Sequence, residues 1–305
     1  MSRPFRFGVS LIDAAPAAEW AAKCRRAEEL GYDVITVADH LGMPAPFPSL
    51  VAAAGATERP RLGTFVLNAG FWNPALLARE VATTDALTGG RLELGLGTGY
   101  VPAEHETAGL PWGTPGERVD HLLRTVEELE RLHGSDELAR VAPRPGGESP
   151  GPGTGGLPRV PLLIGANGDR MLRIAAEHAD IAAFTGARTR QNGALEPVTA
   201  AELDGRVALY RKAAAAREEP AELNLLIQIV AVTDDRRAAI RPWLPRIPSL
   251  SERQVLELPI VLVGTVEQIV EQVRAQRERY GFSYLTVLEP NLEAFAPVVR
   301  ELRGR

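Results

Sequence analysis

Short apolar runs alternate with longer segments of 3.6-residue periodicity along most of the chain. A short run rich in apolar and β-branched residues predicts a strand, and the periodic segment that follows predicts an amphipathic helix. The predicted strands cover residues 5–11, 33–38, 61–67, 91–96, 160–164, 181–184, 223–232 and 284–288. The predicted helices cover residues 17–30, 48–57, 74–87, 115–133, 169–178, 199–217, 266–280 and 292–302. The pattern therefore predicts eight strands, each followed by a helix.

Local signals place several of these helix boundaries. Asn73 precedes Pro74, an arrangement typical of an N-cap followed by proline at the first helical position. The pairs Thr114/Glu117 and Thr265/Gln268 have the spacing of capping boxes. Gly31 follows the first predicted helix, where glycine readily takes the positive φ that ends a helix.

Eight β/α units in about 300 residues predict a (β/α)8 barrel. Several strands are apolar almost throughout, as is typical of a parallel sheet covered on both faces. A doubly wound open sheet is the alternative that this periodicity leaves open. The long gaps after strands four and seven are interpreted as insertions, so residues 1–305 are predicted to form a single domain. The first insertion contains a Gly/Pro-rich stretch at about 143–158, predicted to be a flexible surface loop, and the second, residues 236–262, is predicted to be irregular.

Composition excludes several function classes. With a net charge of −5, the chain lacks the basic excess that duplex nucleic acid or an anionic membrane surface requires. No apolar stretch is long enough for a transmembrane helix, and the N-terminus lacks a signal-peptide pattern. Cys24 is the only cysteine, which excludes an internal disulfide and Cys-rich metal sites and fits a cytoplasmic protein. No HExxH motif occurs, so no metal site is predicted, and the absence of a GxSxG motif leaves serine hydrolase chemistry unsupported.

Candidate chemistry is sought where the strands end, because barrel enzymes place their active sites at the C-terminal ends of the strands. The second strand ends in Asp39-His40, a carboxylate beside an imidazole that could support proton transfer near neutral pH. We expect His40 to face the cavity and Asp39 to form hydrogen bonds near it. The alternative is that His40 only hydrogen-bonds a loop.

Glycine-rich turns follow the fourth and fifth strands, at Gly97-Thr98-Gly99 and Gly165-Ala166-Asn167-Gly168. Glycine lets a ligand approach the backbone, and the N–H groups at a helix start suit an anion. These turns could hold a phosphate tail, although neither has the dinucleotide or Walker A pattern. The alternative is that the glycines only allow tight turns.

The sequence resembles the bacterial luciferase-like superfamily of flavin and deazaflavin oxidoreductases, and the matching segments occur in the family's order along the chain. The resemblance is carried by residues 17–40, 63–99 (GTFVLNAGFWNPALLAREVATTDALTGGRLELGLGTG), 161–180 and 259–290. Within that superfamily the chain is most similar to the branch that uses coenzyme F420. The family is built on a (β/α)8 barrel, which agrees with the strand count.

The resemblance implies roles for individual residues. His40 would stand beside the reactive ring as the catalytic residue, and Asp39 would match the preceding cofactor-contacting acid. A cis non-prolyl peptide would fall at Phe65-Val66, with Asn68 nearby. The glycine turns above, together with Thr185 and Gly186, would hold the phosphate tail of the cofactor.

The implied activity is hydride transfer between F420 and a small or natural-product-type organic substrate. This would be reduction of an activated C=C, C=O or C=N bond, or oxidation of an alcohol. An FMN-dependent monooxygenase of the same barrel and a non-catalytic ligand-binding barrel are the alternatives. The family also implies a homodimer.

The substrate pocket is assigned by expectation to Trp72, Tyr100 and Glu289, for each of which loop packing is the alternative. Sugar-phosphate dehydrogenases of the branch carry a glutamate where Tyr100 stands and use lysines to hold the phosphate. This chain has only Lys23 and Lys212. The sequence therefore argues against a sugar-phosphate substrate.

Overall fold

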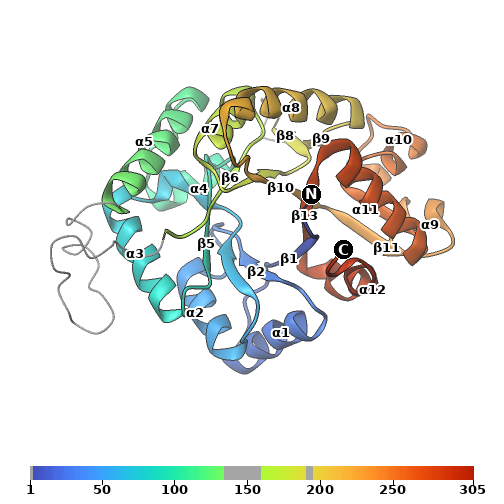
Figure 1. The fold of residues 1–305 in the computed structure, drawn as a ribbon, viewed down its shortest axis with the longest axis horizontal. Coiled ribbons are helices and arrows are strands. Elements are labelled where there is room, and N and C mark those ends of the chain that lie inside the picture. The colour runs from blue at the N-terminus through green and yellow to red at the C-terminus, as the bar shows by residue number, and fades with distance from the viewer. Residues whose placement is uncertain (1–2, 134–158, 190–194) are drawn as a thin grey trace.

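The computed structural model describes residues 3–133, 159–189 and 195–305. Eight parallel strands surround a common centre and are enclosed by helices (Figure 1). The barrel strands are β1 (Arg6–Leu11), β2 (Val34–Val37), β3 (Arg61–Thr64), β5 (Leu92–Gly97), β6 (Leu162–Gly165), β7 (Ile181–Phe184), β10 (Glu222–Ile227) and β13 (Phe282–Leu288). They pair in the order β3-β2-β1-β13-β10-β7-β6-β5, and β3 also pairs with β5. This last pairing closes the sheet, which confirms the (β/α)8 barrel and excludes the open sheet.

Helices follow the strands much as the periodicity predicts. The outer helices are α1 (Ala17–Glu29), α2 (Pro46–Ala56), α3 (Pro74–Leu87), α5 (Pro115–His133), α7 (Asp169–His178), α8 (Ala200–Ala213), α11 (Val266–Tyr280) and α12 (Leu292–Leu302). The predicted caps are present: the Asn73 side chain accepts hydrogen bonds from the amides of Ala75 and Leu76, and Thr265 and Gln268 form a capping box. None of the described helices combines the length and apolarity needed to cross a bilayer.

The insertion after the fourth barrel strand contains a helix that the sequence reading missed. This helix, α4 (Pro102–Ala108), begins with proline at its first position and ends at Gly109, whose φ is +67°. Those two residues are local signals that could have revealed it. The predicted Gly/Pro-rich loop at 143–158 lies outside the described residues. A two-stranded antiparallel hairpin, β8 (Ala187–Thr189) with β9 (Leu195–Pro197), follows β7 and was also not predicted.

The seventh predicted strand, residues 223–232, is wrong in its second half. The chain leaves the barrel at Gln228, whose backbone N–H donates to the carbonyl of Ile260. The remainder is β11 (Ile229–Val232), which pairs with β12 (Val261–Gly264) in a separate two-stranded sheet. Residues 236–262 are correspondingly more regular than predicted, because they hold α9 (Arg236–Ile240), α10 (Glu252–Leu256) and the start of β12. A continuous apolar run cannot by itself show which of two sheets each half joins.

The third predicted strand, residues 61–67, is interrupted. β3 ends at Thr64, and the chain resumes pairing with β5 only at β4 (Leu67–Asn68). Across the gap, the Thr64 hydroxyl donates to the carbonyl of Gly95 (2.9 Å) and accepts from its amide (2.8 Å). One side chain thus satisfies both backbone groups that an unbroken ladder would have paired.

The opposite end of the barrel, where the strands begin, is filled by charged side chains that form ion pairs. Arg6 bonds to Glu93 (2.9 Å) and lies 3.4 Å from Glu222, and Arg61 also bonds to Glu93 (2.7 Å). Burial raises the pKa of Glu222, with Arg6 opposing the effect. The guanidinium of Arg6 also covers the ring of Tyr284. These interactions fill the N-terminal end of the barrel, which leaves the C-terminal end for a ligand.

Gly95→Ala should destabilise the fold. A Cβ at this position would collide with the backbone carbonyl of Thr64, and backbone cannot move aside without breaking the barrel closure. We expect the free energy of unfolding, measured by urea titration, to fall by about 1–3 kcal/mol. Gly205→Ala is the matched control. Gly205 lies in α8 with open space around its Cα, so this change should raise stability by about 0.5–1 kcal/mol. Equal effects of the two substitutions would contradict the packing argument.

Candidate active site

Asp39 connects the end of β2 to the last residue of β4 and to the segment that follows it. Its Oδ2 accepts hydrogen bonds from the amide of Asn68 (3.2 Å) and from Nε1 of Trp72 (2.9 Å). The Trp72 ring also packs edge-on against Phe47 from α2. Burial raises the pKa of Asp39, while these two donors and nearby His40 oppose the rise. Asp39 therefore fixes the two loops relative to each other, a hydrogen-bonding role of the kind that the sequence predicts.

Asn68 extends this network to α4. Its Oδ1 accepts from the amide of Gly70 (3.1 Å), and its Nδ2 donates to Nε2 of His105 (2.9 Å). Because Nδ1 of His105 faces the carbonyl of Pro111 (2.8 Å), that nitrogen must carry the proton and Nε2 must accept. Gly99 adopts a φ of +70°, and a Cβ there would lie 2.6 Å from Asn68 Oδ1. Glycine at 99 is therefore required by the approach of Asn68.

His40 makes its contacts with the segment that follows β5. Its Nδ1 lies 2.8 Å from Oε1 of Glu104 on α4, and its Nε2 lies 3.3 Å from the hydroxyl of Tyr100. The Tyr100 ring stands edge-on to the imidazole with centroids 5.2 Å apart. Glu104 and His105 were missed by the sequence reading. They occur in the undetected helix α4, 64 and 37 residues from their partners His40 and Asn68.

The third strand carries the predicted cis peptide bond, between Phe65 and Val66. The Val66 side chain lies against the inward faces of β5 and β6. A Cβ at Gly97 would come within 2.6 Å of Val66 Cγ2, and one at Gly165 would lie 3.7 Å from the same atom. Gly97 and Gly165 thus make room for Val66, a packing role that the sequence reading did not assign to them. The role of these glycines in holding a phosphate stays a prediction.

The turn between β6 and α7 is open. Gly168 caps α7 without a side-chain hydrogen bond to the first helical amides, and nothing lies within 4 Å of where its Cβ would be. Asn167 is fixed on both sides, since its Oδ1 accepts from Thr185 (2.7 Å) and its carbonyl accepts from Arg206. The amide of Ala166 is occupied, because it donates to Ala183 in β7. The N-terminal amides of α7 are therefore the group in this turn that suits an anion.

Two further predicted site residues have structural partners. Gly186 has a φ of +65° and is packed closely against Ile260. Glu289 receives Nζ of Lys23 (2.6 Å) and the amides of Ile12 (2.8 Å) and Asp13 (3.1 Å). Burial opposes ionisation of Glu289, but these partners outweigh it and lower its pKa. Glu289 thus ties the end of β1 to that of β13 and is not part of the group around His40.

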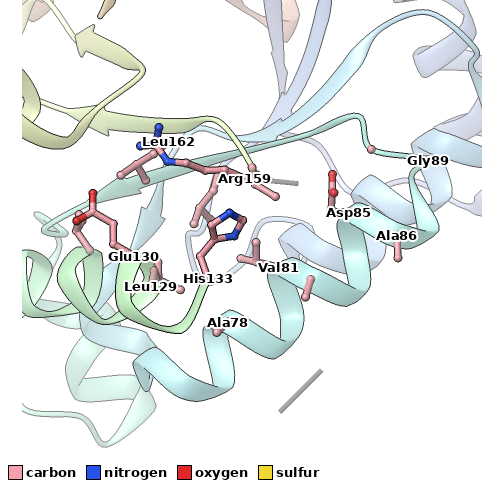
Figure 2. A pocket seen from close by; sticks show the side chains of 15 residues that line it. Ala78, Val81, Asp85, Ala86, Gly89, Leu129, Glu130, His133, Arg159 and Leu162 are labelled. Carbon is pink, nitrogen blue, oxygen red and sulfur yellow. The ribbon is translucent and has the colours of Figure 1, made fainter. Parts of the chain in front are cut away.

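A cavity of about 470 Å³ lies on the flank of the barrel between α3 and α5 (Figure 2). Val81 and Leu129 give it an apolar lining, and Glu130, His133 and Arg159 contribute polar groups. It shares no residue with the networks around Asp39 and His40, so it is separate from the candidate active site. Among the described residues, no group of three or more His, Cys, Asp or Glu side chains is arranged to hold a metal.

The sequence pattern of the luciferase-like monooxygenase family matches residues 1–257. The chain belongs to this family. A 5,10-methylenetetrahydromethanopterin reductase from Archaeoglobus fulgidus is 28% identical over 178 residues, which cover 57% of this chain and 51% of the relative. An F420-dependent glucose-6-phosphate dehydrogenase from Intrasporangium calvum is 36% identical over 166 residues, covering 47% and 50%. These matches span about half the length of each relative.

Among solved structures, an F420-dependent secondary alcohol dehydrogenase, in complex with an F420-acetone adduct, superposes with a TM-score of 0.73. The match covers 98% of both chains at 17% identity. At that identity the likeness is evidence for the shared fold. The comparisons together confirm the family resemblance read from the sequence.

Trp72→Phe should weaken the fold in a pH-dependent way. The substitution keeps the ring against Phe47 but removes the N–H that donates to Asp39. Since burial already raises the pKa of Asp39, its ionisation opposes folding as the pH rises through that pKa, and losing a donor increases this cost. We expect the free energy of unfolding to fall by about 1.5–3 kcal/mol at pH 7.5 and by less at pH 4, where more of Asp39 is protonated.

Urea titrations at the two pH values measure this difference. Trp243→Phe is the control, because the indole of Trp243 has no carboxylate partner among the described residues. A loss in Trp72→Phe of the same size at both pH values would show that packing, not the hydrogen bond to Asp39, is responsible.

Proposed function

We propose that this protein is an F420-dependent oxidoreductase that transfers hydride between the deazaflavin and an uncharged organic substrate. The observation that carries the proposal is His40, held at the open end of the barrel between a carboxylate and a phenol. Such a constellation is suited to proton transfer, which must accompany hydride transfer to or from a carbonyl, alcohol or imine. The names of the relatives and of the structural neighbour, which include F420-dependent dehydrogenases, support the same cofactor.

The residues present fit a long, anionic cofactor. The α7 N-terminus offers amides without a side-chain cap, in open space, for an anionic arm. Val66, in the segment between β3 and β4, packs against the glycines at the ends of β5 and β6. At that position it can support a planar ring. When bound, F420 would supply or accept the hydride. The protein would bind the arm, orient the ring and move the proton.

Two observations bear on the class of substrate: the surroundings of the two lysines and the side chains beside His40. Lys23 is engaged by Glu289, and Lys212 lies on the exposed side of α8. The residues next to His40 along the chain and across the loop are instead exposed and apolar or aromatic: Leu41, Met43 and Tyr100. These observations favour a ketone, an enone, an imine or a secondary alcohol over a sugar phosphate.

An FMN-dependent monooxygenase is the second candidate, favoured by the description of the matching family. The same α7 amides would serve the phosphate of FMN. The two candidates differ in redox chemistry, since the monooxygenase would bind FMN and consume oxygen.

The purified protein should bind F420 with a micromolar dissociation constant and FMN more weakly. Titration followed by F420 fluorescence, with FMN as the competing ligand, measures both. A yellow protein that retains FMN and consumes oxygen would instead establish the second candidate.

His40→Ala should keep F420 affinity within about three-fold but lower turnover by about 10²–10⁴-fold, the usual contribution of a general acid or base. Turnover is measured with reduced F420 and acetone, cyclohexanone or 2-cyclohexenone, with glucose 6-phosphate for comparison. His178→Ala, which removes a helix-packing imidazole paired with Glu130, is the matched control. Undiminished turnover in His40→Ala would point to a ligand-binding barrel or to a different proton donor.

A further inference from the structure

The contacts of His40 define which group donates each hydrogen bond around it. A carboxylate can only accept a hydrogen bond, so the proton of the neutral imidazole lies on Nδ1, facing Glu104 at 2.8 Å. Nε2 then presents its lone pair to the Tyr100 hydroxyl at 3.3 Å. The tyrosine must therefore donate to the histidine, and the three side chains form one chain of hydrogen bonds.

Exposure orders the same three groups from the inside outward. The side chain of Glu104 is 14% exposed and that of His40 is 22% exposed, whereas Tyr100 is 40% exposed. Of these three groups, the phenol is therefore the most accessible to a molecule from solvent. Asp39, although adjacent to His40 in sequence, is directed to Asn68 and Trp72 and is not in this chain of hydrogen bonds.

We propose that Tyr100 is the catalytic residue that exchanges a proton with the substrate oxygen, and that Glu104 is a positioning residue that fixes the His40 tautomer behind it. This proposal deepens the function proposed above and rests on it. It also narrows the substrate to a carbonyl compound or its alcohol, because the phenol is placed to serve an oxygen atom that gains or loses a proton.

The proton balance is as follows. In carbonyl reduction the bound cofactor would supply hydride to the carbonyl carbon, and the oxygen would gain its proton as the O–H bond of Tyr100 breaks. The phenolate left behind regains its proton through His40: solvent protonates Nε2, Glu104 compensates the charge of the imidazolium, and the Nε2–H bond then breaks as the phenol is restored, which returns His40 to its neutral Nδ1–H form. Alcohol oxidation follows the same path in reverse. Burial and the charge of Glu104 raise the pKa of Tyr100, so the phenol holds its proton at neutral pH and can donate it.

The first test uses the protein without cofactor. Five histidines are present, so ¹⁵N-histidine labelling and long-range ¹H–¹⁵N spectra can report each tautomer. His105, which must be protonated at Nδ1, and His121, whose Nε2 donates to Ala69, provide internal references for the two tautomers. In mildly alkaline buffer, wild-type His40 should match His105. In Glu104→Ala it should shift toward the Nε2-protonated form, and in Glu106→Gln, a change on the exposed side of the same helix, it should not move.

The second test separates chemistry from binding. Tyr100→Phe keeps the ring against His40 and removes only the hydroxyl. With acetone or cyclohexanone, kcat should fall by about 10²-fold or more, while KM and F420 affinity change less than about three-fold. Glu104→Gln should lower kcat to a smaller extent, and Glu106→Gln should leave it unchanged.

The outcomes distinguish the two proposals. A wild-type His40 protonated on Nε2, or full turnover by Tyr100→Phe, would overturn the proton path whatever the cofactor. Failure of the wild-type protein to bind F420, with His40 still protonated on Nδ1, would overturn the proposed function but uphold the role of Glu104 as the positioning residue.

Discussion

The double hydrogen bond between the Thr64 hydroxyl and the backbone of Gly95 is the contact on which the open end of the barrel depends. Strand β3 must stop pairing with β5 for the chain to turn inward at Phe65 and Val66, and an interrupted ladder leaves buried backbone groups without partners. A threonine hydroxyl can donate and accept at once, so it satisfies both groups on Gly95. The absence of a side chain at Gly95 lets Thr64 approach closely enough to do so.

The inward turn organises the rest of the site. It places Val66 over the glycines of β5 and β6, and it returns the chain to pairing at Asn68, whose amide and side chain bond to Asp39 and His105. The interruption of the third strand therefore positions Val66 inside the barrel and also positions Asn68, which holds α4 through His105. Because α4 also carries Glu104, the position of His40 is set by the same arrangement.

The helices were predictable because their ends depend on neighbouring residues. The site was only partly predictable because its contacts join residues that are far apart in the sequence. Asn73 and the capping boxes determine helix starts through contacts within three residues, which a sequence displays directly. The tail of the seventh strand was misplaced because its partner, β12, begins about 30 residues later. Asp39 and His40 could be found from their place at a strand end. Glu104, the partner of His40, could not be found in this way. The sequence places Asp39 next to His40, and only the fold shows that Asp39 bonds to Asn68 and Trp72 instead.

Family resemblance and geometry contributed different parts of the site. The cis peptide at Phe65-Val66 was implied by resemblance, since no rule of composition or periodicity points to it. The resemblance implies one role, phosphate binding, for all the glycine turns, but the glycines have different surroundings. Gly97 and Gly99 accommodate Val66 and Asn68, whereas Gly168 faces open space at the start of a helix. The groups proposed to transfer the proton follow β2 and β5, and the amides suited to an anion follow β6. A ligand that uses both must extend from the α7 N-terminus across Val66 to Tyr100, a shape that an elongated cofactor has and a compact substrate does not.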